Sequence, residues 1–285
     1  MTPGRRLSLS GWSSSVSLLV LCALAPCDLQ ASAWNQEAGH GQLIVNATFF
    51  QTSSAYDSVG NPQAFGYNGR FRQIQLNPYL EYGLSHRYTL VVNAFVPDLS
   101  YTNRYSSQRS FGFGNIEMGL ERRLNSLESP WAISGQITVA FPAYSAKRNP
   151  PPGNHQEDIE ARFLVGRGAT VLQHHVFWDA EAAYRYRSGA PADQFRSDIT
   201  GGIYVSSRLM VMGQFFGITS LRNGLPIELI SNPNAQSDFD LYKGQLSVVR
   251  RVTRRTRLQA AWNDTIAGRN TGRGQTFTLA LWRNF

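Results

Sequence analysis

The sequence predicts an all-β fold: a transmembrane antiparallel β-barrel of about twelve strands that follows a cleaved signal peptide. Three observations predict it. Apolar and polar side chains alternate along segments of roughly ten residues. The connections between these segments alternate between short and long. The chain begins with the charge and hydropathy pattern of an export signal.

The N-terminus has the three parts of a secretory signal peptide. Arg5 and Arg6 supply positive charge, an apolar stretch follows over residues 16–25, and Ala31-Ser32-Ala33 places small residues at a cleavage site. The apolar stretch is too short to cross a bilayer as a helix. We therefore expect cleavage after Ala33.

The chain is expected to have three parts. Residues 1–33 form the signal peptide, residues 34–40 form a short periplasmic N-terminal segment that could instead fold into the lumen, and residues 41–285 form the outer-membrane barrel. Both cysteines, Cys22 and Cys27, fall in the signal peptide. The mature chain is thus expected to have no disulfide, no thiolate metal site and no cofactor.

The charge balance narrows the expected partners. The formal net charge is +8, which in a chain that stays inside the cell would suggest nucleic acid. For an exported chain we expect outer-membrane lipid and lipopolysaccharide, or anionic solutes, and no nucleic acid. The slightly negative mean hydropathy of −0.28 suits a barrel, because lipid-facing residues alternate with polar ones.

The segment 174–187 shows the alternation most clearly. One face is apolar from Val176 to Tyr186, and the other carries Asp179, Glu181, Arg185 and Arg187. A sandwich core could not bury these charges unpaired. The same pattern defines twelve expected strands: 41–52, 68–83, 87–97, 113–124, 130–142, 156–167, 174–187, 196–206, 209–219, 239–251, 254–266 and 275–285.

The connections fall into two classes that alternate along the chain. The longer class is rich in Gly, Asn, Pro and Ser, as expected of outer loops, whereas tight turns are typical of the periplasmic side. The short connections are near 84–86, 125–129, 168–173, 207–208 and 252–253, and the longer ones near 52–67, 98–112, 143–155, 188–196, 220–238 and 267–274.

Aromatic residues on the apolar face gather near both strand ends, where amphipathic rings sit at the membrane interfaces. Near the short turns are Tyr82, Tyr88, Trp131, Trp178 and Phe285, and near the long loops are Phe49, Phe141, Tyr184, Tyr186 and Tyr242. Pro78 is a residue that does not suit the interior of a strand. It removes a ladder hydrogen bond, so we expect a bulge or local break there.

The polar face of each strand should line the lumen. The expected lumen and constriction residues are Glu117, Glu121, Glu160, Arg162, Asp179, Glu181, Arg185, Arg187, Lys243 and Arg257. Two interpretations stay open: the charges set the selectivity of a water-filled pore, or they pair into a salt-bridge network that fills the barrel. Twelve strands lie between barrels that side chains fill and barrels that stay open, so strand number does not decide.

The sequence does not predict an enzyme. It contains neither a GxSxG nor an HExxH motif. Among five histidines only His155 falls on an expected outer loop. His174 and His175 are adjacent on a strand and point in opposite directions, which makes a poor metal pair. No catalytic, cofactor-binding or metal-binding residue is therefore assigned.

The last ten residues, TFTLALWRNF, resemble the C-terminal assembly signal of bacterial outer-membrane barrels, which implies recognition of Phe285 by the barrel assembly machinery. The segments FGFGNIEMGLERRL, FWDAEAAYRYRSGAPADQFRSDITGGIYV and LMVMGQFFGITS resemble hairpins of the phenol-degradation-pathway (MetA-type) outer-membrane channels. That family has a "YR.R.G....D" loop, which corresponds here, with one residue fewer between the glycine and the aspartate, to Tyr184, Arg185, Arg187, Gly189 and Asp193. The resemblance implies a transport channel for aromatic or other hydrophobic substrates.

The mature N-terminus, WNQEAGHGQ, resembles XagA-like barrels linked to exopolysaccharide genes. The primary expectation is an outer-membrane channel for passive transport of small polar or amphipathic solutes. The alternatives are a barrel associated with exopolysaccharide export, a plugged structural or adhesive barrel, and a barrel-embedded hydrolase. For an oligosaccharide, the inward-facing Tyr79, Phe177, Tyr204 and Trp282 are candidate stacking platforms.

Overall fold

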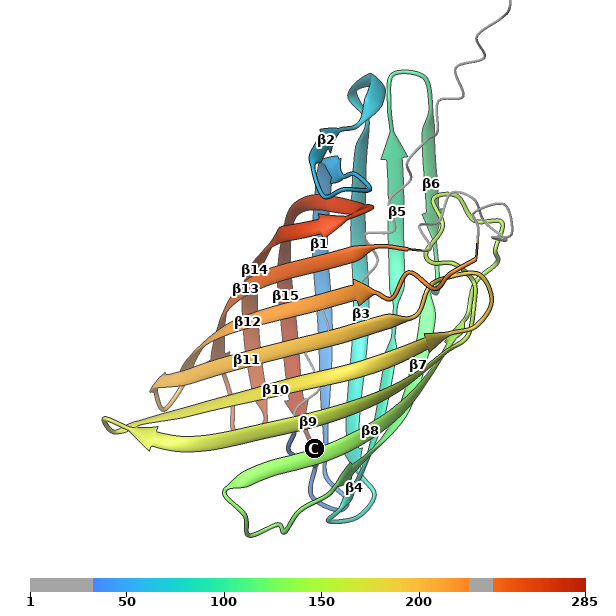
Figure 1. The fold of residues 1–285 in the computed structure, drawn as a ribbon. Helices are drawn as coiled ribbons and strands as arrows, with labels where there is room; N and C mark the ends of the chain where they lie inside the picture. Colours follow the sequence, from blue (N-terminus) through green and yellow to red (C-terminus); the bar gives the residue numbers. More distant parts are fainter. Residues whose placement is uncertain (1–32, 226–237) are drawn as a thin grey trace, which may run out of the picture.

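A computed structural model describes residues 33–225 and 238–285 of the chain. The expected signal peptide with both cysteines lies outside the described residues. Within them, no helix is long and apolar enough to cross a membrane. The chain instead forms a closed antiparallel barrel of twelve strands with three extra strands (Figure 1).

The barrel strands follow one another around the wall in chain order, and β1 closes it by pairing with both β15 and β3. β4 lies between β3 and β7 in the wall, and the three extra strands, β2 and the β5–β6 hairpin, extend one end of the barrel (Figure 1). The strands are β1 (Gly41–Tyr56), β2 (Pro62–Ala64), β3 (Arg70–Gly83), β4 (Tyr88–Ala94), β5 (Val96–Thr102), β6 (Ser107–Phe111), β7 (Asn115–Arg123), β8 (Trp131–Pro142), β9 (Asp158–Val171), β10 (His174–Arg187), β11 (Gln194–Ser206), β12 (Leu209–Ser220), β13 (Asp240–Arg251), β14 (Thr256–Arg269) and β15 (Thr271–Asn284).

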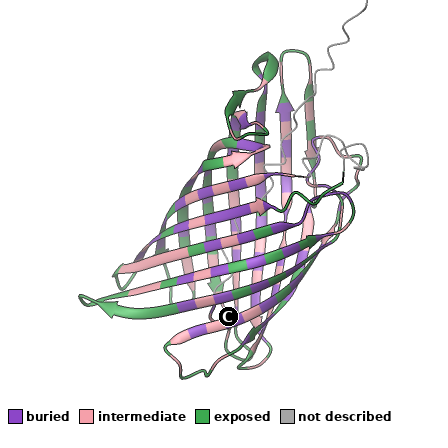
Figure 2. Cartoon of the chain, viewed as in Figure 1, coloured by how far each residue is buried: buried purple, intermediate pink, exposed green. Residues whose placement is uncertain are grey.

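Burial alternates along the strands, but the buried side is polar (Figure 2). On β10, Glu181 and Arg185 are buried, whereas Tyr184 and Tyr186 are about half exposed, at 46% and 49%. This inverts the burial of a soluble protein, because the outer face meets lipid and the polar face meets the lumen. The all-β barrel expected from the alternation is therefore confirmed.

Two of the expected outer loops are wrong. The loop expected over 98–112 contains the β5–β6 hairpin, and the loop expected over 267–274 is a tight turn at Asn270 between β14 and β15. Asn270 has a positive φ of 51°, a conformation that Asn tolerates better than most residues. In both places the strands continue past the membrane, and a sequence rich in Gly and Asn does not distinguish such an extension from a loop.

The local break expected at Pro78 is present, but it lies in the neighbouring strand. β3 continues through Pro78, and its ladder is interrupted at Ala94 and at Phe95, the residue that divides β4 from β5. Proline has no N–H to donate. The side-chain amide of Asn77 donates to the Ala94 carbonyl at 2.7 Å instead, so a neighbouring side chain satisfies part of the lost pairing.

Aromatic and basic side chains cluster at the periplasmic rim of the outer face. Trp131 and Trp178 meet edge to face with ring centroids 5.6 Å apart, and the Arg167 guanidinium lies 5.0 Å from the Trp131 ring centre. Tyr82 stacks on Phe285 with centroids 6.5 Å apart. Such rings with cationic neighbours are typical of a membrane interface.

Candidate functional site: a lumen with two chambers

The lumen holds two cavities at different heights. The upper chamber, about 80 Å³, lies under the outer loops, and the lower chamber, about 760 Å³, lies toward the periplasmic turns. β10 passes both: Arg185 and Arg187 line the upper chamber, whereas Phe177 and Asp179 line the lower one. The upper chamber has room for only a few water molecules, so it is the narrow part of the described lumen.

Glu160 is the centre of an ion-pair network on the wall formed by β9, β10 and β11. Its carboxylate accepts hydrogen bonds from Arg162 at 2.8 Å, Arg185 at 2.7 Å and Arg196 at 3.1 Å. All four side chains are at most 9% exposed. One buried carboxylate therefore holds three guanidinium groups in fixed positions.

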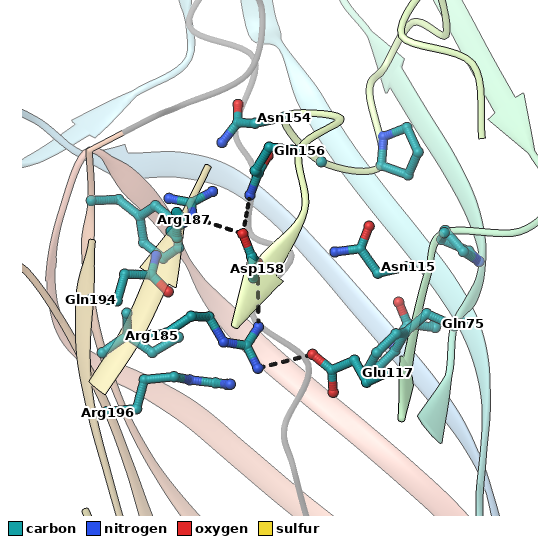
Figure 3. Close-up of a pocket in the computed structure, with 17 residues that line it drawn as sticks. Gln75, Asn115, Glu117, Asn154, Gln156, Asp158, Arg185, Arg187, Gln194 and Arg196 are labelled. Carbon is teal, nitrogen blue, oxygen red and sulfur yellow. Dashed lines mark hydrogen bonds and ion pairs between the residues drawn. The ribbon is translucent and has the colours of Figure 1, made fainter. Parts of the chain in front are cut away.

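The two ends of this network reach other strands. Arg162 also pairs with Glu181 and, at 2.7 Å, with Asp198, while Arg185 pairs with Glu117 on β7 at 2.9 Å. Toward the outer loops, Arg185 and Arg187 both face Asp158, as Figure 3 shows. Removing one member of such a buried network leaves its partners uncompensated, which is costly.

Neutral side chains predominate where the wall formed by β12, β13 and β14 faces the lumen, alongside Lys243 and Arg257. Gln245 donates to Gln214 at 2.6 Å and to Ser247 at 3.0 Å, and Gln259 donates to Ser247 at 3.1 Å. Asn263 donates to Gln245 at 3.2 Å. The lumen thus has one wall of ion pairs and one wall on which amides predominate, so a solute between them meets mainly ions on one side and mainly neutral hydrogen-bonding groups on the other.

The lower chamber combines apolar and acidic groups. Phe177, Tyr204, Met210, Met212 and Trp282 form an apolar cluster inside the lumen. Soft, polarisable methionine and aromatic surfaces adapt to varied apolar ligands.

Two carboxylates also line the lower chamber. Asp179 is 4% exposed, and within the described residues its Oδ1 atom has no hydrogen-bond partner. Glu81 accepts hydrogen bonds from Tyr79 and Gln36, each at 2.6 Å. Two basic residues, Arg257 and His175, line this chamber as well, and Arg257 lies over the Trp282 ring at 6.0 Å.

The segment that follows Ala33 lies in the periplasmic mouth of the barrel. Asn35 donates to Thr89 at 3.2 Å, and Ala38 forms a parallel bridge with Gly83. Gly83 permits this approach, because a Cβ atom there would lie 2.1 Å from the Glu37 carbonyl oxygen. Part of the N-terminal segment therefore occupies the mouth, and Trp34, Asn35 and Gln36 line the lower chamber.

The structure brings most of the expected lumen residues together. Glu117, Glu160, Arg162, Glu181 and Arg185 join in one network. Two other expected residues lie apart from this network: Asp179 lines the lower chamber, and Glu121 lies outside both chamber linings.

Two more of the expected lumen residues, Lys243 and Arg257, lie over aromatic rings. Lys243 lies over the Phe50 ring at 5.9 Å, and Arg257 lies over Trp282. Asp158 and Arg196 also belong to the network but were not expected there. Their even-numbered positions, shared with Glu160 and Asp198, are the signal that could have found them, since residues two apart share a face.

The "YR.R.G....D" motif closes the outer loop between β10 and β11. Asp193 accepts hydrogen bonds from the Tyr184 hydroxyl at 2.7 Å and from the Arg187 amide at 2.8 Å. Asn223, from the next outer loop, donates to Asp193 at 2.8 Å. Burial raises the pKa of Asp193, but these hydrogen bonds outweigh it and hold the pKa below the usual range. Gly189 takes the positive φ of 81° that the loop requires.

The histidines form no metal cluster in the part of the chain that the structure describes. His155 packs its ring against Tyr144 with centroids 5.4 Å apart. His174 and His175 contact different partners, the Tyr204 carbonyl and the Thr170 hydroxyl.

The sequence matches no protein-family model and no curated protein. The fold is similar to the COG4313 outer membrane channel from Pseudomonas putida F1, with a TM-score of 0.64 and 15% identity over 90% of this chain and 99% of that chain. It is also similar to the KdgM porin, with a TM-score of 0.50 and 4% identity over 86% of this chain and 99% of that chain. The resemblance to the phenol-degradation-pathway channels is thus confirmed in the fold, which is that of an outer-membrane β-barrel.

Proposed function

We propose that the protein is an outer-membrane channel for the passive passage of small polar or amphipathic solutes. The observation that carries the proposal is the lower chamber, whose volume of about 760 Å³ falls in the range of small-molecule sites. Its apolar cluster and its polar edges offer both kinds of contact that an amphipathic solute needs. The ion-paired upper chamber acts in this proposal as the selectivity constriction.

We further propose a preference for cationic solutes in the lower chamber. Asp179 contributes a buried carboxylate oxygen that has no hydrogen-bond partner among the described residues, and Glu81 contributes a second carboxylate. Apart from His175, the basic side chain among the residues that line this chamber is Arg257, and it lies over an aromatic ring. An acidic lining raises the local concentration of cations.

Single-channel recording of the refolded mature protein in a planar bilayer tests this proposal. We expect ohmic, cation-preferring current steps that small organic cations block from the periplasmic side. A correctly folded barrel that gives no current contradicts the channel and favours the structural or adhesive alternative. Lipid and peptide cleavage assays, with His155→Ala as the test variant, then examine the hydrolase alternative.

Oligosaccharide passage is the second candidate function. Phe177, Tyr204 and Trp282, three of the four expected stacking platforms, line the lower chamber together with Gln42 and Gln214. Aromatic faces next to amides suit sugar rings. If neutral oligosaccharides block the current and organic cations of equal size do not, the oligosaccharide function replaces the cation preference.

The partners proposed are outer-membrane lipid, lipopolysaccharide and the barrel assembly machinery. Phe285 is 47% exposed at the lipid-facing rim, where a partner can reach it. The variant Phe285→Ala should assemble more slowly in cells, with the unfolded form accumulating, while refolding in detergent is unchanged. Equal assembly in cells contradicts this role.

A further inference from the structure

Glu121 on β7 is a buried carboxylate that the barrel wall satisfies only in part. It is 1% exposed, and within the described residues its Oε1 atom has no hydrogen-bond partner. Its in-register neighbours, Thr89 on β4 and Gln136 on β8, are neutral. The nearby Arg123 donates through Nη2 to the Trp131 carbonyl at 2.7 Å. Buried carboxylates in this state are expensive unless a cation approaches.

The N-terminal segment passes directly beside this carboxylate. The Ser134 hydroxyl donates to the Ala33 carbonyl at 2.9 Å and also lies within hydrogen-bonding reach of Glu121. On the other side of Glu121, the Thr89 hydroxyl accepts a hydrogen bond from the backbone N–H of Gln36 at 3.0 Å. The peptide unit that joins Ala33 to Trp34 is therefore anchored through Ser134, a residue that also contacts Glu121.

The Trp34 side chain packs against the barrel wall at Gly166 and Phe177. A Cβ atom at Gly166 would lie 2.7 Å from the Trp34 ring, so only glycine leaves room for the indole there. Phe177 meets the indole edge to face with centroids 6.4 Å apart. The indole thus fixes where the Trp34 nitrogen lies.

We propose that export completes this site. Hydrolysis of the Ala33–Trp34 peptide bond consumes one water, leaves a carboxylate on Ala33 and creates an α-ammonium on Trp34. That ammonium binds the Glu121 carboxylate and donates to Ser134, and residues 34–40 become a plug tethered in the periplasmic mouth. The precursor lacks this charge at Trp34, so the plug is fixed only in the mature chain. This inference does not depend on what the channel carries.

Chemical labelling of amines tests the site without measuring transport. Mature protein is purified from outer membranes, its intact mass establishes whether it begins at Trp34, and it is then treated with an acetylating N-hydroxysuccinimide ester near pH 7. The chain has two lysines, and the exposed Lys147 serves as an internal standard. A free α-amine, with a pKa of about 8, reacts readily at this pH. We expect the Trp34 amine to react at least tenfold more slowly in the wild type than in Glu121→Gln, because a cation held by a buried carboxylate is a poor nucleophile. A tenfold difference in rate corresponds to roughly 1.4 kcal/mol of extra stabilisation of the ammonium form.

A second variant keeps the proposal testable if Glu121→Gln folds poorly. Gly166→Leu should displace the Trp34 indole from its packing site against Gly166 and make the Trp34 amine reactive, while Glu121 stays in place. Gly168→Leu is the matched control, since a Cβ atom there would have only one neighbour, at 3.9 Å. Heat-modifiable migration on gels reports folding of each variant. A wild-type amine that reacts as fast as in both variants, or a mature chain that begins elsewhere than Trp34, overturns the proposal.

Discussion

The two chambers of the lumen differ in how their charged side chains are paired. Around the upper chamber, Arg162 and Arg185 each contact more than one carboxylate. In the lower chamber, Asp179 keeps an oxygen without a partner in the described residues. Charges of the first kind are held by one another and support the wall, whereas those of the second kind remain available to a passing solute. The place of a charge in the lumen therefore decides whether it is held in an ion-pair network or keeps an atom open to a solute.

The largest effect is expected from breaking the paired region. Arg162→Met leaves Glu160, Glu181 and Asp198 close together without their shared cation. We expect a loss of about 3–5 kcal/mol in the free energy of unfolding, measured by urea titration of protein in lipid vesicles. Asp179→Asn, which breaks no ion pair, is the control and should unfold as the wild type does. Equal stability of both variants would remove the distinction between the chambers.

The next effect concerns ion selectivity at the upper chamber. Arg185 presents its guanidinium to the cavity, so Arg185→Ala should raise the ratio of cation to anion permeability. A unit charge about 7 Å away in water contributes ~0.6 kcal/mol, or roughly threefold. Reversal potentials in a salt gradient measure the ratio, with the exposed, outward-facing Arg250→Ala as the control. An unchanged reversal potential removes Arg185 from the constriction.

A smaller change is expected from the lower chamber. Asp179→Asn should reduce cation preference by roughly twofold, because the chamber is wider and a charge about 10 Å from the ion contributes ~0.4 kcal/mol. The affinity of a blocking organic cation should fall with it. Thr200→Ala, at a neutral position of the same lining, should leave both quantities unchanged. If the two variants behave alike, the lower chamber has no electrostatic preference.

The smallest effect concerns pH and the outer loop above the network. The pKa of Asp193 is lowered in the folded protein, so its hydrogen bonds stabilise the loop above its unfolded pKa of about 4 and are lost as pH falls through the folded value. Limited proteolysis of the loop should accelerate below that range. Asp193→Asn should show the faster cleavage already at neutral pH and lose the pH dependence. A loop that is equally resistant at both pH values contradicts this anchor.

The alternation of side chains predicted the strands well where each face meets one environment. Along β10 the predicted bounds, 174–187, are those of the structure. Prediction failed beyond the expected strand ends, as in β6, because no residue of that strand is buried and the periodic signal fades. A break near Pro78 was predictable from the sequence. Its position in the neighbouring strand was not, because that depends on the hydrogen bond of Asn77 and on the pairing between strands.

By itself, the sequence determined the barrel, the face each side chain takes and the polar character of the lumen, because strand periodicity is a local property of the chain. Only the tertiary structure decided which charges meet. Arg185 reaches Glu117 across 68 positions and two intervening strands, and Asp179, two residues from Glu181, meets no cation in the described residues. Those pairings depend on the stagger between strands around the closed wall, which is set by the whole barrel rather than by any one segment.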